Sequence, residues 1–417
     1  MAVDAGDLDE AKFFLESFIQ AGSSTVMGAQ DLLLDAAAAE AGLGCIAMAQ
    51  SRYHDAAEHF RLAGGWIPQK EIDRRREYRR AEADSYYRQG QEQGDDDALR
   101  LAVNLSKPLL RETWYARTLP QWTILQSKLG DALQKLGERD GCIALLEGAA
   151  AAYRALLDVV TRQSAPREWA ITQSNLGFTL LLLGERQNSA VQLEKAATAY
   201  RAALEELSVE GNPSSWARAQ GNLANALAEL GRRETRTMRV EEAVAAYRAI
   251  LNVLPRESAP LEWAMTQNNL GLALLLLGER QSSAAQLKEA LAAFRAALEE
   301  RTRERVPSDW TVTQTNLGDV LLSISVHEDS MARLKEAMTA YRDALGVFEA
   351  ADAGHHSERI RHSLAKAEWL LAERISKGKD RASLFRTPMM MLSRLRRVLS
   401  KGEARSARTR STASILP

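Results

Sequence analysis

The sequence predicts an all-α fold, an α-solenoid of antiparallel helix pairs, because one pattern recurs with a constant period. Tryptophan recurs every 47 residues, leucine follows it by seven residues, and an aromatic residue followed by arginine stands later in each period. A fixed period of this length is typical of repeat proteins, in which each unit packs only on its neighbours. Five units are marked by Trp122, Trp169, Trp216, Trp263 and Trp310.

Composition and charge exclude several classes of protein. Of the 417 residues, 46% are hydrophobic and 26% are charged, an ordinary balance for a soluble protein. The apolar run Leu272–Leu277 is far shorter than the roughly 20 residues of a membrane span. The acidic N-terminus lacks the pattern of a secretory signal, and Cys45 and Cys142 have no metal-site or disulfide spacing. We therefore expect a cytoplasmic protein that holds no metal and no cofactor.

The chain divides into five expected segments. Residues 1–30 are a capping helix or the remnant of an upstream repeat, and 31–111 hold one 34-residue repeat and one irregular helix pair. Residues 112–356 hold the five 47-residue units, and 357–375 form a C-terminal capping helix. Residues 376–417 are a basic, largely disordered tail with a short amphipathic helix. The tail carries a net charge of +9, against about −10 for the rest of the chain.

One shorter unit shows how a helix pair is packed. Small residues let two antiparallel helices approach each other, and large residues fill the space beside them. In residues 37–70, seven positions follow this pattern: Leu43, Gly44, Tyr53, Ala56, Phe60, Ala63 and Pro68. They match the tetratricopeptide repeat, and the 47-residue units resemble the expanded repeats of kinesin-light-chain-like and bacterial signalling proteins of that superfamily. The resemblance implies a right-handed superhelix whose concave groove binds a peptide or protein segment.

Prolines and glycines are expected to mark the ends of the first helix in each 47-residue unit. A proline three residues before the tryptophan suits the first helical position, because its missing donor would be unpaired there. Asn212 is a good cap for such a helix, whereas Ala259 in the equivalent place is not. A glycine fifteen residues after the tryptophan predicts a left-handed helix end. These glycines are Gly137, Gly184, Gly231 and Gly278.

The groove side of each first helix follows from the helical rotation of about 100° per residue. Positions four, seven and eleven after the tryptophan share its packing stripe, and positions two, five, nine and twelve lie opposite. That opposite side is apolar in the second and fourth units and polar in the third; its candidate contact residues are Phe178, Arg218, Asn225, Met265, Asn268 and Leu272. Two interpretations stay open, an apolar binding groove or tighter packing on neighbouring units.

Asparagine stands at position six in four of the five units, at the edge of the expected groove. A row of such amides can donate to and accept from the backbone of an extended peptide, whatever its sequence. The resemblance implies this role, and it also implies the alternative that the asparagine ties adjacent repeats together. The row consists of Asn175, Asn222, Asn269 and Asn316, with Lys128 in the first unit.

Catalytic motifs are absent from the sequence: it has no P-loop, no G-x-S-x-G and no H-E-x-x-H pattern. We therefore expect a non-enzymatic scaffold with a protein or peptide partner and no nucleic acid. The alternative is a regulatory or sensor module of a bacterial signalling or effector system whose catalytic domain is on another chain. For the tail, the alternatives are a solvated end, contact with an anionic membrane surface, or self-contact. The oligomeric state is left open.

Overall fold

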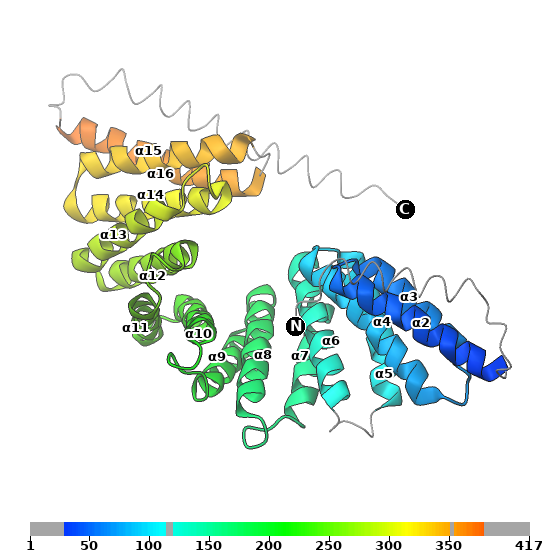
Figure 1. Cartoon of the computed structure of the whole chain (residues 1–417). Helices are drawn as coiled ribbons and strands as arrows, with labels where there is room; N and C mark the ends of the chain where they lie inside the picture. The colour runs from blue at the N-terminus through cyan, green and yellow to red at the C-terminus, as the bar shows by residue number, and fades with distance from the viewer. Residues whose placement is uncertain (1–28, 114–119, 351–353, 379–417) are drawn as a thin grey trace, which may run out of the picture. The chain divides into compact units, whose positions relative to one another are not determined.

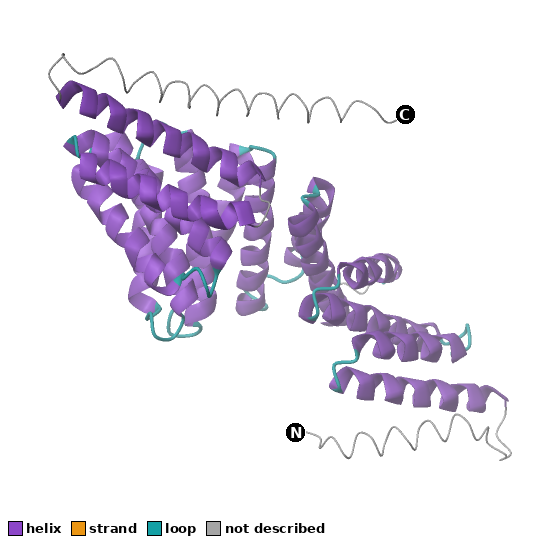
Figure 2. Cartoon of the chain, turned by 90° about the horizontal axis from the view of Figure 1, so that it is seen from above, coloured by secondary structure: helices purple, strands orange, loops and turns teal. Residues whose placement is uncertain are grey.

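The structure, a computed structural model, describes residues 29–113, 120–350 and 354–378. In these ranges all regular elements are α-helices, fifteen in number (Figures 1 and 2). This confirms the all-α class and the succession of helix pairs that the repeat period predicts. The predicted N-terminal segment and the basic tail lie almost wholly outside the described residues, so they stay predictions.

The chain divides into two compact parts, residues 1–208 and 209–417. The described helices of the N-terminal part are α2 (Ala29–Ala49), α3 (Tyr53–Trp66), α4 (Ile72–Glu92), α5 (Asp96–Glu112), α6 (Pro120–Asp140), α7 (Ile143–Leu157), α8 (Pro166–Arg186) and α9 (Ala190–Leu204). Those of the C-terminal part are α10 (Pro213–Arg233), α11 (Met238–Val253), α12 (Pro260–Gln281), α13 (Ala284–Glu300), α14 (Pro307–Glu328), α15 (Met331–Ala350) and α16 (Gly354–Gly378).

In each part, two rows of helices pack on each other. Every first helix packs on the second helix of its own repeat, and every second helix packs on the next first helix. The first helices also contact one another directly: α4 with α6 and α6 with α8, then α10 with α12, α12 with α14 and α14 with α16. No comparable contact joins second helices within the described ranges. The row of first helices is therefore the more closely spaced, and we call its solvent side the inner face.

The starts of the first helices follow the sequence prediction. Pro166, Pro213, Pro260 and Pro307 each occupy the first helical position of α8, α10, α12 and α14. Asn212 caps α10, because its side-chain oxygen accepts from the backbone N–H of Ser215 at 3.0 Å. Ala259 makes no side-chain cap at the same place on α12. The chain thus enters each first helix at a fixed residue.

The predicted ends of the first helices are wrong. The helices continue past Gly184 and Gly278 to Arg186 and Gln281, and likewise past Gly137 and Gly231. The left-handed backbone lies four residues after three of these glycines, with positive φ at Gly141 (69°), Asn188 (50°) and Ser282 (50°), whereas α10 ends in extended backbone at Glu234. A short polar side chain tolerates this conformation, so glycine is not needed at the helix end itself.

The glycines are needed instead for a close approach between the two helices of a repeat. A Cβ added to Gly184 would lie 2.6 Å from Cδ2 of Leu193, and one added to Gly278 would lie 2.8 Å from Cδ2 of Leu287. The glycine at position eight has the same role further along the helix. A Cβ on Gly271 would lie 2.7 Å from Cε1 of Phe294. The spaced glycines therefore set the distance between paired helices.

Candidate binding surface

Exposed side chains, apolar in every 47-residue repeat except one, form a row on the inner face of each part. They stand at position two, one turn into each first helix, and we call this set the inner row. Its members are Ile124 (54% exposed) and Ile171 (37%) in the N-terminal part, and Arg218, Met265 (48%) and Val312 (41%) in the C-terminal part. Leu272, at position nine of α12, is also exposed (38%). Each of these side chains stays in water although its helix is packed on both neighbours.

The other positions predicted to face the groove are mostly buried. Position five is covered by neighbouring helices, and Asn268 is only 4% exposed. Asn268 accepts a hydrogen bond from Asn316 at 3.0 Å, so it lies between α12 and α14. Position twelve is equally covered, as at Leu275. Phe178 and Asn225, at position nine, are half-buried. The surface open to a partner is therefore narrower than the helical rotation predicts.

The asparagine row connects successive first helices. Nδ2 of Asn175 lies 3.3 Å from Oδ1 of Asp131, and Nδ2 of Asn269 lies 3.3 Å from Oδ1 of Asn225. In both cases a position-six amide donates to position nine of the preceding first helix. Asn316 follows a repeat whose position nine is apolar, and it donates to Asn268 instead.

Asn222 differs from the other members of the row. The described residues give its half-buried side chain no hydrogen bond. It lies four residues after Arg218 on α10, so both side chains share one face of the helix. Arg218 is exposed and has no ion pair among the described residues. Asn222 and Arg218 thus present unused donors side by side.

Position nine is linked to the aromatic residue of the second helix, a relationship that sequence reasoning missed. Tyr247 donates to Asn225 at 2.6 Å, and equivalent tyrosines donate to Asp131 and Asp319 at 2.6 and 2.7 Å. Two repeats have an apolar residue at position nine. Leu272 is matched with Phe294, which has no hydroxyl, whereas Phe178 is matched with Tyr200, which has one. The two positions are always 22 residues apart, so comparing the repeats with one another would have found the link in every repeat except the second.

Hydrogen bonds from three side chains of the N-terminal part converge on the carboxylate of Asp131. It accepts from Tyr153 at 2.6 Å, from Tyr87 at 3.2 Å and from Asn175 at 3.3 Å. Burial raises the pKa of the Asp131 carboxyl, while the hydrogen bonds from the two tyrosines act in the opposite direction. Burial and the nearby carboxylate raise the pKa of Tyr153 as well, so its hydroxyl remains a donor. This cluster joins four helices, α4, α6, α7 and α8.

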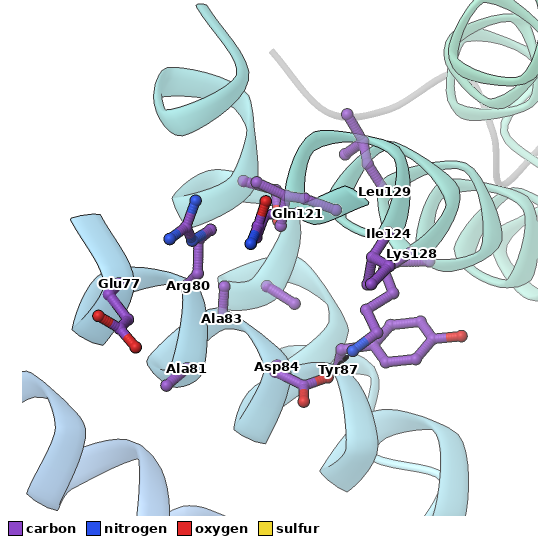
Figure 3. A pocket seen from close by; sticks show the side chains of 14 residues that line it. Glu77, Arg80, Ala81, Ala83, Asp84, Tyr87, Gln121, Ile124, Lys128 and Leu129 are labelled. Carbon is purple, nitrogen blue, oxygen red and sulfur yellow. Dashed lines mark hydrogen bonds and ion pairs between the residues drawn. The ribbon is translucent and has the colours of Figure 1, made fainter. Parts of the chain in front are cut away.

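A pocket of about 400 Å³ lies between α4, α5 and α6 of the N-terminal part (Figure 3). Lys128, which replaces asparagine at position six, pairs with Asp84 of α4. Its ammonium group also lies 5.6 Å from the centre of the Tyr87 ring. Figure 3 shows the side chains of Lys128, Asp84 and Tyr87 close together. Ile124 of the inner row and Arg80 line the same pocket. The pocket therefore extends the inner row as a recess with both apolar and charged walls.

The five tryptophans that mark the 47-residue repeats are not part of this surface. Trp122 is buried, and the four others are half-buried. The guanidinium of Arg256 lies 5.0 Å from the ring centre of Trp263 and bonds both Glu299 and Glu300 at 2.6 Å. This contact fixes the loop before α12 to the end of α13. The tryptophans thus support the packing role that the sequence predicts for their stripe.

Within the described ranges, no group of three or more His, Cys, Asp or Glu side chains is placed to hold a metal ion. Among the same residues, no helix is long and apolar enough to cross a membrane.

Comparison with known proteins identifies the repeat. Residues 263–303 match the family model of the tetratricopeptide repeat. No curated protein matches the chain. Similar solved structures include a thermophilic tetratricopeptide-repeat protein of Thermus thermophilus, at 21% identity over 58% of this chain and 99% of that one, with a TM-score of 0.35. Another is the C-terminal part of a tetratricopeptide-repeat protein of Cytophaga hutchinsonii, at 12% identity, 73% and 98% coverage and a TM-score of 0.44.

The matched segment is one period of a longer pattern. It begins at Trp263, and its tryptophan, leucine and aromatic positions recur in the repeats before and after it. The helices of those repeats pack in the same order throughout each part. Residues 263–303 are therefore a tetratricopeptide repeat, and the other periods carry the same pattern.

Proposed function

We propose that the chain is a non-enzymatic scaffold that binds a peptide or protein segment along the inner row. The observation that supports this proposal is that large apolar side chains are exposed to solvent at the same position of several first helices. Arg218 occupies that position in α10, so the fold itself does not require an apolar residue there. Burying a side chain such as Met265 or Val312 against a partner contributes about 1.5–3 kcal/mol. The row therefore suits binding better than it suits packing.

The spacing of the row favours an elongated partner. Packed helices lie about 8–10 Å apart, and an extended chain advances about 3.3 Å per residue. Every third residue of an extended segment would thus reach the next first helix. Met265 and Val312 would contact two such residues, with Leu272 beside them. A compact small molecule would contact one helix and leave the rest of the row exposed.

Asn222 and Arg218 would fix the polar backbone of that segment. The Asn222 amide offers a donor and an acceptor that the described residues do not use, and Arg218 offers further donors four residues away. Asn175, Asn269 and Asn316 already donate to neighbouring helices. Among the asparagine row, Asn222 is therefore the member we expect to contact a partner directly.

Selection of random displayed peptides on the full-length chain tests the proposal. Affinities of the selected peptides are then measured by fluorescence anisotropy. The variant Met265→Lys/Val312→Lys should bind at least about tenfold more weakly, because two apolar contacts are lost. A control, Met238→Lys/Met331→Lys, changes two methionines of similar or greater exposure, 68% and 47%, on the second helices α11 and α15. Equal loss in both variants, or none in the first, would show that the inner row is not the binding surface.

A further inference from the structure

Ion pairs join the second helices of the C-terminal part on their outer side, which is the solvent side of the second-helix row. In each pair, the arginine after the aromatic residue of one second helix contacts a glutamate 41 residues later, on the next second helix. Arg248 of α11 pairs with Glu289 of α13 at 2.5 Å. Arg295 of α13 pairs in the same way with Glu336 of α15. The repeat therefore places a cation beside a carboxylate at this point.

The N-terminal part lacks this carboxylate between α5 and α7. Counted back by the repeat period, Lys107 of α5 stands in the place of the arginine. Gly148 of α7, 41 residues after Lys107, stands in the place of the glutamate. Lys107 is exposed and has no ion pair among the described residues. Because glycine has no side chain, the space that a glutamate would occupy beside Lys107 stays open.

A pocket of about 450 Å³ lies at this point, and we call it the outer pocket. Both Lys107 and Gly148 line it, and its base is formed by α6, on which α5 and α7 pack. Much of its wall is apolar, with Leu129 and Leu133 from α6 and Leu145 from α7. Among the described residues, only Lys107 brings a charge to the lining. Apolar walls with a few polar groups are typical of sites for small ligands.

Gln126 of α6 adds a polar group that the fold uses only in part. Its side chain lines the outer pocket and is 7% exposed. Nε2 of Gln126 donates to the carbonyl oxygen of Ala152 at 3.2 Å, whereas Oε1 accepts no hydrogen bond among the described residues. A buried acceptor without a donor is unfavourable. This oxygen therefore favours a ligand that has an O–H or N–H group.

We propose that the outer pocket binds a small carboxylic acid whose apolar body has one hydrogen-bond donor. The carboxylate of the ligand would lie beside Lys107, in the place of the missing glutamate. The apolar body would contact Leu129 and Leu133, and the donor would bond Oε1 of Gln126. This site lies between second helices, so the inference is independent of the peptide binding proposed for the inner row.

The lining of the outer pocket favours a monoanion over other ligands. A neutral molecule would leave the ammonium group of Lys107 without a partner. A phosphate monoester would bring a charge of about −2 to a single cation. A small anion without an apolar body would leave Leu129 and Leu145 uncovered. A carboxylic acid with an apolar body satisfies the cation and the walls together.

Three acids of increasing length test the site on the full-length chain: para-hydroxybenzoate, para-hydroxyphenylacetate and para-hydroxyphenylpropionate. In titrations followed by saturation-transfer NMR, at least one should bind with a Kd of about 1 mM or lower. Its analogue without the hydroxyl should bind about threefold to tenfold more weakly. Its neutral amide should bind about threefold to fivefold more weakly. Binding by none of the acids, or equal binding by the acid and either analogue, would overturn the proposal.

Gly148→Glu restores the glutamate of the ion pair and fills the outer pocket from within the chain. A Cβ at Gly148 would lie 3.3 Å from Cδ1 of Leu133, so a small shift of that side chain accommodates it. The variant should bind the best acid at least about tenfold more weakly. Val191→Glu, at an exposed residue of α9 outside the pocket, adds the same charge and should keep the affinity. Equal loss in both variants would indicate general charge repulsion and overturn the assignment.

Lys107→Gln tests the cation without changing the pocket wall, and it keeps the test valid if Gly148→Glu fails to fold. It should weaken the acid about threefold to fivefold and leave the neutral amide unchanged. Lys195→Gln is the matched control, because Lys195 is also exposed on a second helix and has no ion pair among the described residues. If Lys107→Gln weakened the acid no more than Lys195→Gln does, Lys107 would not hold the carboxylate.

The two cysteines locate the bound acid directly. Cys142 lines the outer pocket, whereas Cys45 is exposed on α2 and does not. A saturating concentration of the best acid should slow alkylation of Cys142 by iodoacetamide several-fold and leave Cys45 unchanged, as measured by mass spectrometry. Protection of neither cysteine, or equal protection of both, would place the acid elsewhere and overturn the proposal. Neither result bears on the displayed-peptide selection, which tests the inner row separately.

Discussion

The side-chain amide of Asn269 donates to Oδ1 of Asn225, one helix earlier in the C-terminal part, at a distance of 3.3 Å. The same oxygen accepts from Tyr247 at 2.6 Å. Three helices, α10, α11 and α12, therefore meet at one amide. The asparagine row was a candidate for ligand contact, and in this repeat its amide is already engaged in the fold.

Asn269 and Asn222 are expected to respond differently to replacement by alanine. Asn269→Ala removes the bond to Asn225 and should lower the free energy of unfolding by about 0.5–1.5 kcal/mol. Asn222→Ala removes no hydrogen bond found among the described residues, so thermal melting should stay nearly unchanged while peptide affinity falls several-fold. Calorimetry and anisotropy on both variants separate the two roles. A lowered melting temperature for Asn222→Ala with unchanged affinity would assign that residue to the fold as well.

Relative to the native chain, Asp131→Asn should have a higher free energy of unfolding near neutral pH than at acid pH. Burial raises the pKa of the Asp131 carboxyl in the folded state. The contribution of the Asp131 carboxyl to the free energy of unfolding is therefore complete at pH values below its pKa in the unfolded chain. It is lost as the pH rises through its pKa in the folded chain. Asparagine keeps the acceptor for Tyr153 without the charge, as Asn225 does for Tyr247. Unfolding curves measured from about pH 4 to about pH 8 should show that the free energy of unfolding of the variant rises relative to that of the native chain as the pH rises.

The reverse change provides the control. Asn225→Asp places a carboxylate beside Tyr247 in the C-terminal part and should cost more stability at about pH 8 than at about pH 4. A pH-independent difference in both variants would mean that the charge of Asp131 does not contribute to stability.

Arg301→Leu should raise the free energy of unfolding by about 1–3 kcal/mol. Arg301 is 6% exposed, its Nε has no hydrogen-bond partner, and its guanidinium bonds Thr313 at 3.1 Å. Burial lowers the pKa of this guanidinium, while the exposed Asp309, whose Oδ2 lies 3.8 Å from Nη2, acts in the opposite direction. Leu254 and Leu207 occupy the same place in earlier repeats. Thermal melting measures the gain.

Arg305→Leu is the matched control for that change, because Arg305 is exposed and pairs only with Glu300 at 3.3 Å among the described residues. Its effect should stay within about 0.5 kcal/mol. Destabilisation by Arg301→Leu would mean that the buried guanidinium is better satisfied than its bonds suggest.

Gly271→Ala should destabilise the C-terminal part by about 1–3 kcal/mol, because its Cβ would lie 2.7 Å from the Phe294 ring. Gly221→Ala on α10 is the control: its Cβ would lie 3.5 Å from Cδ1 of Ile250, an ordinary contact. Alanine favours a helix over glycine, so this variant should melt slightly higher. Calorimetry on both tests whether helix spacing sets the glycine requirement, and equal effects would contradict it.

The fold was predictable because it depends on features that recur. Constant spacing of Trp, Leu and Gly identified the helix pairs, and Pro213 identified a helix start to the residue. The helix ends were mispredicted because a glycine near a terminus has two explanations. Gly184 is required because Leu193 of the paired helix lies close to it. A contact between two helices cannot be predicted from the local sequence.

The site was less predictable than the fold. Helical rotation correctly placed Met265 and Leu272 on the exposed side, but it also placed Asn268 there. A rotation angle describes one helix, whereas the burial of Asn268 depends on how closely α14 approaches α12.

The bond between position six and position nine of the preceding repeat restricts how such a chain could be rearranged. A repeat with a polar residue at position nine, such as Asn225, can be followed by one with an asparagine at position six. A second copy of that repeat inserted after the first would retain the link, because Asn222 of the copy would meet Asn225. Placing it after Leu272 would leave the amide without that acceptor. The order of the repeats therefore decides which asparagines join position nine of the helix before them, and Asn316, which follows Leu272, bonds Asn268 instead.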